Sequence, residues 1–198
     1  MCRLFETIRV VNGVPQHLAW HERRMNQAGK ELWNDGKPFL LSQEITVPPE
    51  FSTGLVQCNI FYGPGEPKIS FKYYRRRVIR SLKMVECNSI DYHLKYSDRS
   101  LLESLFMLRG GSDDVIIVKN GLITDTLISN LIFLEGKDWY TPANPLLKGT
   151  CRNRLLSEGR LTEREIRPGD IGHFTGCKLI NAMRDPEEDA LIPATEIT

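Results

Sequence analysis

The sequence lacks several features that mark common protein classes. It has no apolar run long enough to cross a bilayer, no signal-peptide core, and no Gly-rich dinucleotide loop, Walker loop or serine elbow. Its five cysteines, at positions 2, 58, 87, 151 and 177, form no C-x-x-C pair, which favours free thiols in a reducing compartment over disulfides or a structural zinc. The formal net charge is only +1, so the overall charge indicates neither a nucleic-acid binder nor a membrane binder. These absences predict a soluble cytoplasmic protein.

The composition is that of an ordinary globular protein. Hydrophobic residues make up 41% and charged residues 26% of the 198 positions, which is enough to bury a core in one large domain or two small ones. The apolar spacing predicts strands over 4–11, 55–62, 68–74 and 78–85 around a helix over 17–33, and then a helix after residue 98, a hairpin over 115–126 and a helix opening at 149. The pattern therefore predicts two α/β-type units that are joined near residues 86–91.

One lysine stands at the end of a half-apolar run, just before the second of these helices. Ser97 or Asp98 is expected to cap that helix, so Lys95 is expected to lie ahead of its positive N-terminal end. That position, with partial burial, lowers the pKa of a lysine and makes it a nucleophile. The alternative is an ordinary surface lysine at the end of a strand.

Other residues offer weaker signals. Gly149 and Thr150 at a helix start form a potential anion site, although most helix starts bind only water. Asp125 in the hairpin is able to pair with a cationic ligand atom or simply to face solvent. Arg24 lies on a helix, where most arginines are only solvated. His17 and His21 have the spacing of two metal ligands but no third ligand is recognisable, so we expect no metal site. The basic run at 75–77 either attracts an acidic substrate or is a solvated sheet edge.

Taken together, these segments resemble the class IV, or fold-type IV, pyridoxal-phosphate enzymes, which include branched-chain and D-amino-acid aminotransferases and aminodeoxychorismate lyase. The resemblance runs over nearly the whole chain. The matching segments are FETIR at 5–9 with NG at 12–13, HERRM at 21–25, the lysine at 95, NGLITD at 120–125 with SNLIF at 129–133, TP at 141–142 with LLKGTCR at 146–152, and INAM at 180–183.

The resemblance implies a role for each matched residue. Lys95 takes the position of the Schiff-base lysine and general acid–base. The other implied cofactor contacts are Arg24 on the phosphate, Asp125 on the pyridine nitrogen, Leu147 on the ring face, and Thr150, Cys151, Asn181 and Ala182 around the phosphate; Phe5 is expected to line the substrate side. Three of these positions depart from the family pattern, because Asp125 replaces a glutamate, Cys151 a threonine and Ala182 a serine or threonine.

The resemblance also implies a fold and a reaction. We expect a two-domain α+β fold, with a small α+β domain over residues 1–88, shortened at its start, and a larger, β-rich, pseudo-barrel domain over 89–198 that binds pyridoxal 5'-phosphate. The expected activity is that of an aminodeoxychorismate lyase, which forms 4-aminobenzoate, a folate precursor, and pyruvate. The alternatives are a branched-chain or D-amino-acid aminotransferase and a non-catalytic binding protein of the same fold. A homodimer that acts on a small amino-acid-like molecule is expected, with no nucleic acid or membrane as partner.

Overall fold

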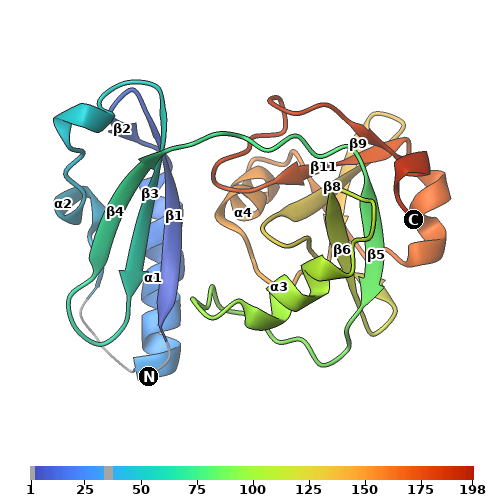
Figure 1. Ribbon diagram of the computed structural model, residues 1–198, viewed down its shortest axis with the longest axis horizontal. Helices are drawn as coiled ribbons and strands as arrows, with labels where there is room; N and C mark the ends of the chain where they lie inside the picture. The colour runs from blue at the N-terminus through green and yellow to red at the C-terminus, as the bar shows by residue number, and fades with distance from the viewer. Residues whose placement is uncertain (1–2, 34–37) are drawn as a thin grey trace. The chain divides into compact units, whose positions relative to one another are not determined.

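The structure is a computed structural model that describes residues 3–33 and 38–198. Its chain forms two compact units (Figure 1): the first contains Met1–Arg76 and Leu94–Asp98, and the second contains Arg77–His93 and Arg99–Thr198. The expected domain boundary between residues 88 and 89 stays a prediction, and the two compact units divide the chain at other points. Cys2 lies outside the described residues.

The first unit is an antiparallel sheet in the order β2-β1-β3-β4 with one long helix against it. The strands are β1 (Leu4–Val11), β2 (Val14–Pro15), β3 (Leu55–Tyr62) and β4 (Lys68–Tyr73), and the helices are α1 (Leu18–Trp33), the short α2 (Leu41–Glu44) and η1 (Pro49–Phe51). Alternate residues of β1 and β3 are buried, as expected for strands with one face on a core. Asn12 and Gly13 both have positive φ, at 48° and 78°, and form the tight turn between β1 and β2.

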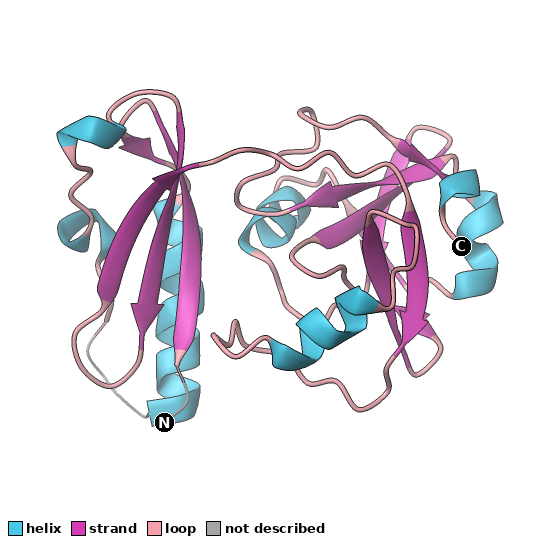
Figure 2. Cartoon of the chain, viewed as in Figure 1, coloured by secondary structure: helices cyan, strands magenta, loops and turns pink. Residues whose placement is uncertain are grey.

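The second unit contains two sheets. A three-stranded sheet has the order β5-β6-β7, with β5 (Leu82–Glu86), β6 (Asp114–Lys119) and β7 (Leu122–Ile123). A five-stranded sheet has the order β10-β9-β8-β11-β12, formed by β10 (Thr162–Arg164), β9 (Asp138–Pro142), β8 (Asn130–Glu135), β11 (Gly176–Ile180) and β12 (Ile192–Pro193). The helices are α3 (Ser100–Met107), α4 (Thr150–Ser157), η2 (Pro168–His173) and η3 (Ala194–Glu196). Figure 2 shows the strands gathered in the middle of this unit.

The mixed α and β class predicted from the sequence is confirmed. Two local predictions are wrong. The strand expected over 78–85 begins only at Leu82, because the chain before it makes no strand pairing. The helix expected to be capped by Ser97 or Asp98 has Arg99 at its N-cap and no side-chain cap. Within the described part of the chain, no helix is both long and apolar enough to span a membrane.

Candidate active site

A buried carboxylate organises the charged residues of the first unit. The alternation of β1 places Glu6 on the same face as Leu4 and Ile8, beneath α1, and its side chain is completely buried. Arg24 donates from Nε to Oε1 at 2.7 Å and from Nη2 to Oε2 at 2.6 Å, and His21 Nδ1–H donates to Oε2 at 2.7 Å. Spacing of three along α1 puts His21 and Arg24 on one face of that helix. The carboxylate therefore holds both side chains in fixed positions.

The charge state of this cluster follows from its burial and its pairing. Burial raises the pKa of Glu6, but the charge of Arg24 and the hydrogen bond and charge of His21 lower it further, so that the pKa is about 2. Burial lowers the pKa of His21 and outweighs the opposing effect of Glu6; the charges of Arg24 and Lys95 lower it as well. At neutral pH the cluster therefore contains a carboxylate, a guanidinium and a neutral imidazole.

Lys95 belongs to the same unit and lies beside β1. The Phe5 amide donates to the Lys95 carbonyl at 3.0 Å, and Tyr96 forms a β-bridge with Leu4. The ammonium of Lys95 lies 4.2 Å from the centre of the Phe5 ring, a cation–π contact. Lys95 is therefore positioned by pairing with β1, about 90 residues earlier in the chain. The helix cap by Ser97 or Asp98 that the sequence predicts plays no part.

A second group of predicted residues surrounds Asp125 in the second unit. The Asp125 side chain is buried just after β7, where it accepts from the Leu147 amide at 2.8 Å and from Asn130 Nδ2 at 2.7 Å. Asn130 Nδ2 also donates to the Leu147 carbonyl at 2.8 Å. The side-chain amide of Asn130 therefore holds both Asp125 and Leu147 in place. Burial raises the pKa of Asp125 to about 7, against the lowering effect of its hydrogen bonds and of Arg152. A cation beside this carboxylate would restore its charge.

The start of α4 follows Leu147, whose amide binds this carboxylate, by two residues. Gly149 is the N-cap residue, the helix has no side-chain cap, and no acidic residue occupies its first turn. A Cβ on Gly149 would lie 2.0 Å from Asn130 Oδ1, so this approach requires glycine. Thr150 and Cys151 are buried in the first turn, and burial above all raises the pKa of the Cys151 thiol to about 12. The uncapped N–H groups of this turn are suited to an anion such as phosphate.

The loop after β11 contains the last two predicted residues. Asn181 Nδ2 donates to Ser129 Oγ at 3.0 Å and to the Ile128 carbonyl at 3.3 Å, while its Oδ1 accepts from the Met183 amide at 2.8 Å. Ala182 is half-buried between them in the turn that Asn181 and Arg184 close by a β-bridge. This loop is thereby held against the segment between Asp125 and Asn130.

The structure thus gathers the predicted residues in two groups. The first unit holds Phe5, Arg24 and Lys95, and the second holds Asp125, Leu147, Thr150, Cys151, Asn181 and Ala182. The cofactor and substrate roles of these residues stay predictions. Among residues 3–33 and 38–198 no group of three or more His, Cys, Asp and Glu side chains is placed to hold a metal.

Two residues with organising roles were given no role in the sequence interpretation. Glu6 was detectable, because a glutamate on the apolar face of an alternating strand requires a buried partner. Asn130 was quoted only as part of a motif, and nothing local indicates that its amide would join residues 125 and 147.

Comparisons with known proteins identify the family to which this chain is similar. The family described as amino-transferase class IV matches residues 67–185. An uncharacterized protein of Haemophilus influenzae is 43% identical over 185 residues, which cover 92% of this chain and 98% of that protein. The crystal structure of a candidate 4-amino-4-deoxychorismate lyase from Haemophilus somnus is 35% identical with a TM-score of 0.87, over 92% of this chain and 97% of that one. A candidate amino-acid aminotransferase from Mesorhizobium loti has the same fold, with a TM-score of 0.79 and 20% identity over 98% of both chains.

The chain belongs to the class IV aminotransferase family. The expected fold type is confirmed, and so is the expectation of a pyridoxal-phosphate-dependent enzyme that acts on a small molecule.

Proposed function

We propose that this protein is an aminodeoxychorismate lyase, which converts 4-amino-4-deoxychorismate into 4-aminobenzoate and pyruvate. The observation that carries the proposal is the likeness, at 35% identity and over nearly the full length of both chains, to the candidate lyase of Haemophilus somnus. Its product would serve folate synthesis.

The residues of the second unit fit the cofactor. Asp125 is a buried carboxylate whose hydrogen bonds within the described part of the chain come from the neutral donors Asn130 Nδ2 and Leu147 N–H, which suits the protonated ring nitrogen of pyridoxal phosphate. The uncapped start of α4 suits the phosphate. When it is bound, the cofactor supplies an aldehyde that reacts with amines and a ring that withdraws electrons.

Each residue of this group then has a defined task. Asp125 would hold a proton on the ring nitrogen of the cofactor, and Leu147, whose amide donates to Asp125, would help to hold the ring. The amides of Thr150 and Cys151 bind the phosphate from the helix start. Asn181 and Ala182 add contacts from their loop, where Ala182 has only its backbone N–H to donate.

The family resemblance assigns cofactor and substrate roles to residues of the first unit as well. Lys95 would hold the cofactor, and its Nζ would take up and return a proton during the reaction. Arg24, oriented by its two hydrogen bonds to Glu6, binds the phosphate. The Phe5 ring lies against the ammonium of Lys95 and restricts the positions that Nζ adopts. Phe5 would also line the substrate pocket.

One assay separates the lyase from an aminotransferase. Purified protein reconstituted with pyridoxal phosphate is given 4-amino-4-deoxychorismate, and 4-aminobenzoate is followed by fluorescence and pyruvate by a coupled dehydrogenase. Equal amounts of both products, absent in Lys95→Ala, are expected. Transfer of amino groups from branched-chain or D-amino acids to 2-oxoglutarate without release of 4-aminobenzoate would reject the lyase in favour of the aminotransferase, and neither activity would favour a non-catalytic binding protein.

We also propose that the protein is a homodimer in the cytoplasm. Three apolar side chains on and just after α3, Leu101, Met107 and Leu108, are 43%, 71% and 54% exposed, which supports a partner surface. Cysteines 58, 87, 151 and 177 are free thiols, which supports a reducing compartment. Light scattering of the purified protein tests the dimer, and a monomeric mass at micromolar concentration would reject it.

A further inference from the structure

The sheet of the first unit has two different faces. Apolar residues of β1, β3 and β4 pack beneath α1 on one face, together with Glu6. The intervening residues of these strands point to the other face, the face away from α1. No acidic residue occupies this second face on β1, β3 or β4, which all lie in the described part of the chain, whereas Lys68 and Lys72 of β4 belong to it and are exposed. The face away from α1 therefore favours an anionic ligand.

The amine of Lys95 lies on this same face. Phe5 points away from α1, because its neighbours Leu4 and Glu6 are the buried residues of the alternating strand. Its ring stacks on that of Phe61, the directly opposite residue of β3, with 5.7 Å between the ring centroids. Lys95 Nζ lies 4.2 Å from the centre of the Phe5 ring. A molecule that reacts at this amine therefore meets the next residues along the same face of the sheet.

The next row of this face contains a side-chain amide whose N–H groups have no acceptor. Asn59 lies directly opposite Thr7, and its Oδ1 accepts from Thr7 Oγ1 at 3.2 Å and from Gln57 Nε2 at 2.8 Å. These two bonds fix the orientation of the amide. Asn59 Nδ2 donates to no residue in the described part of the chain, although the side chain is half-buried. A partly buried donor without an acceptor favours the arrival of a ligand oxygen.

The spacing along the face matches the ring of the substrate named above. Residues two apart on a strand are separated by about 7 Å, so the row of Thr7 and Asn59 lies about 7 Å from the row of Phe5 and Phe61. The product 4-aminobenzoate carries its amine and its carboxylate at opposite ends of a six-membered ring, which is a comparable span. An amine placed beside Phe5 therefore puts the carboxylate near Asn59.

We propose that Asn59 is a specificity-determining residue that binds the substrate carboxylate at the end of the ring opposite the reacting amine. Asn59 Nδ2 donates to a carboxylate oxygen, while Thr7 and Gln57 hold the amide in the required orientation. The identity of the substrate rests on the proposed lyase function, but the carboxylate contact is measured by binding alone.

The test is the affinity of the holoenzyme for 4-aminobenzoate and for aniline, which lacks the carboxylate, measured by titration calorimetry. Asn59→Asp keeps the shape of the side chain and both acceptor bonds, but it replaces the donor with a negative charge. We expect it to weaken 4-aminobenzoate by about tenfold or more and to leave aniline unchanged. Thr7→Val releases the amide on one side and is expected to weaken 4-aminobenzoate about threefold.

The outcomes separate this inference from the lyase function. No binding of 4-aminobenzoate to the wild type, unchanged affinity in both variants, or an equal loss for aniline would overturn the role of Asn59, even in a protein that releases 4-aminobenzoate in the lyase assay. A selective loss in Asn59→Asp supports the carboxylate contact even in a protein without lyase turnover.

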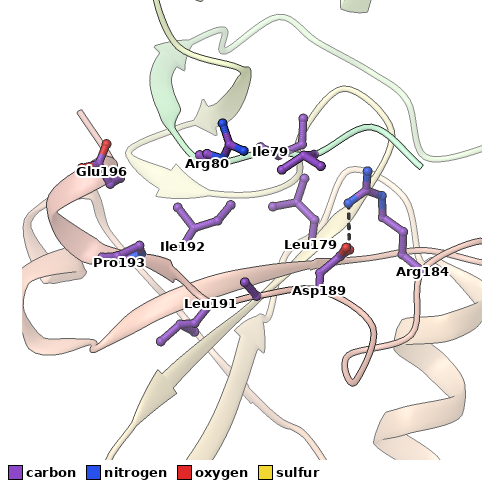
Figure 3. A pocket seen from close by; sticks show the side chains of 11 residues that line it. Ile79, Arg80, Leu179, Arg184, Asp189, Leu191, Ile192, Pro193 and Glu196 are labelled. Carbon is purple, nitrogen blue, oxygen red and sulfur yellow. Dashed lines mark hydrogen bonds and ion pairs between the residues drawn. The ribbon is translucent and has the colours of Figure 1, made fainter. Parts of the chain in front are cut away.

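A cavity of the second unit supplies the control. Its volume is about 440 Å³, which is large enough for the same ring, and Leu179 and Ile192 form its apolar middle (Figure 3). Arg80 also lines this cavity, so 4-aminobenzoate bound there would respond to Arg80→Ala. We expect that variant to leave the affinity unchanged. A loss as large as that of Asn59→Asp would place the compound in the cavity and contradict the proposal.

Discussion

Replacement of Glu6 by glutamine tests the buried charge cluster of the first unit. A pKa lowered from 4.5 to about 2 corresponds to about 3 kcal/mol of stability at neutral pH, because each pKa unit is worth about 1.4 kcal/mol. Glutamine keeps the shape but removes the charge that pairs with Arg24. We therefore expect Glu6→Gln to lower the free energy of unfolding at pH 7 by about 3 kcal/mol.

The dependence of this difference on pH is the sharper result. A carboxyl with a depressed pKa contributes stability above its unfolded pKa of 4.5 and loses it as the pH falls toward 2. The gap between wild type and Glu6→Gln should therefore shrink by about 2 kcal/mol between pH 5 and pH 3.

Urea unfolding of the cofactor-free protein measures this gap. In a Trp139→Phe background the fluorescence comes from Trp20 and Trp33, which both lie on α1 of the unit that contains Glu6. Glu66→Gln, an exposed change in the same unit, is the matched control and should cost little at any pH. A gap for Glu6→Gln that is constant from pH 7 to pH 3 would refute the reasoning.

Three further predictions concern the second unit. Asp125→Ala is expected to keep the fold but to lower turnover severely, since the ring nitrogen loses its partner; near-normal rates would contradict that role. In the cofactor-free protein, burial raises the pKa of Asp125 from 3.8 to about 7, so wild-type stability should fall relative to Asp125→Ala as the pH rises from 4 to 7, as measured by urea unfolding. Gly149→Ala should lower stability by about 2 kcal/mol, because its Cβ meets an Asn130 side chain that is held by two hydrogen bonds, and should weaken cofactor binding in a titration. Gly111→Ala, which meets nothing, is the control, and equal losses in both variants would reject the steric argument.

Much of this fold was predictable because the signals are local. The alternation of residues 4–11 and the Asn12–Gly13 turn are properties of short segments, and the structure has β1 and its turn there. The order of the motifs along the chain was enough to predict the family, and the comparisons confirm that prediction.

The rest depends on contacts between distant parts of the chain. Lys95 pairs with β1 and not with a helix start, and the pairing of Leu4 with Tyr96 joins positions 92 residues apart. The same return of the chain assigns Leu94–Asp98 to the first unit, which no composition change marks. The Asn130 side-chain amide donates to the backbone carbonyl of Leu147, 17 residues away. A hydrogen bond between such distant residues cannot be predicted from local sequence patterns.

The central claim is that Lys95 binds pyridoxal phosphate. Protein reconstituted with the cofactor should show a visible absorption band that borohydride abolishes, and peptide mapping of the reduced protein should find the cofactor attached to Lys95 alone. Lys95→Ala should show no such band. Absence of the band after reconstitution, its persistence in Lys95→Ala, or attachment to another lysine would contradict the account.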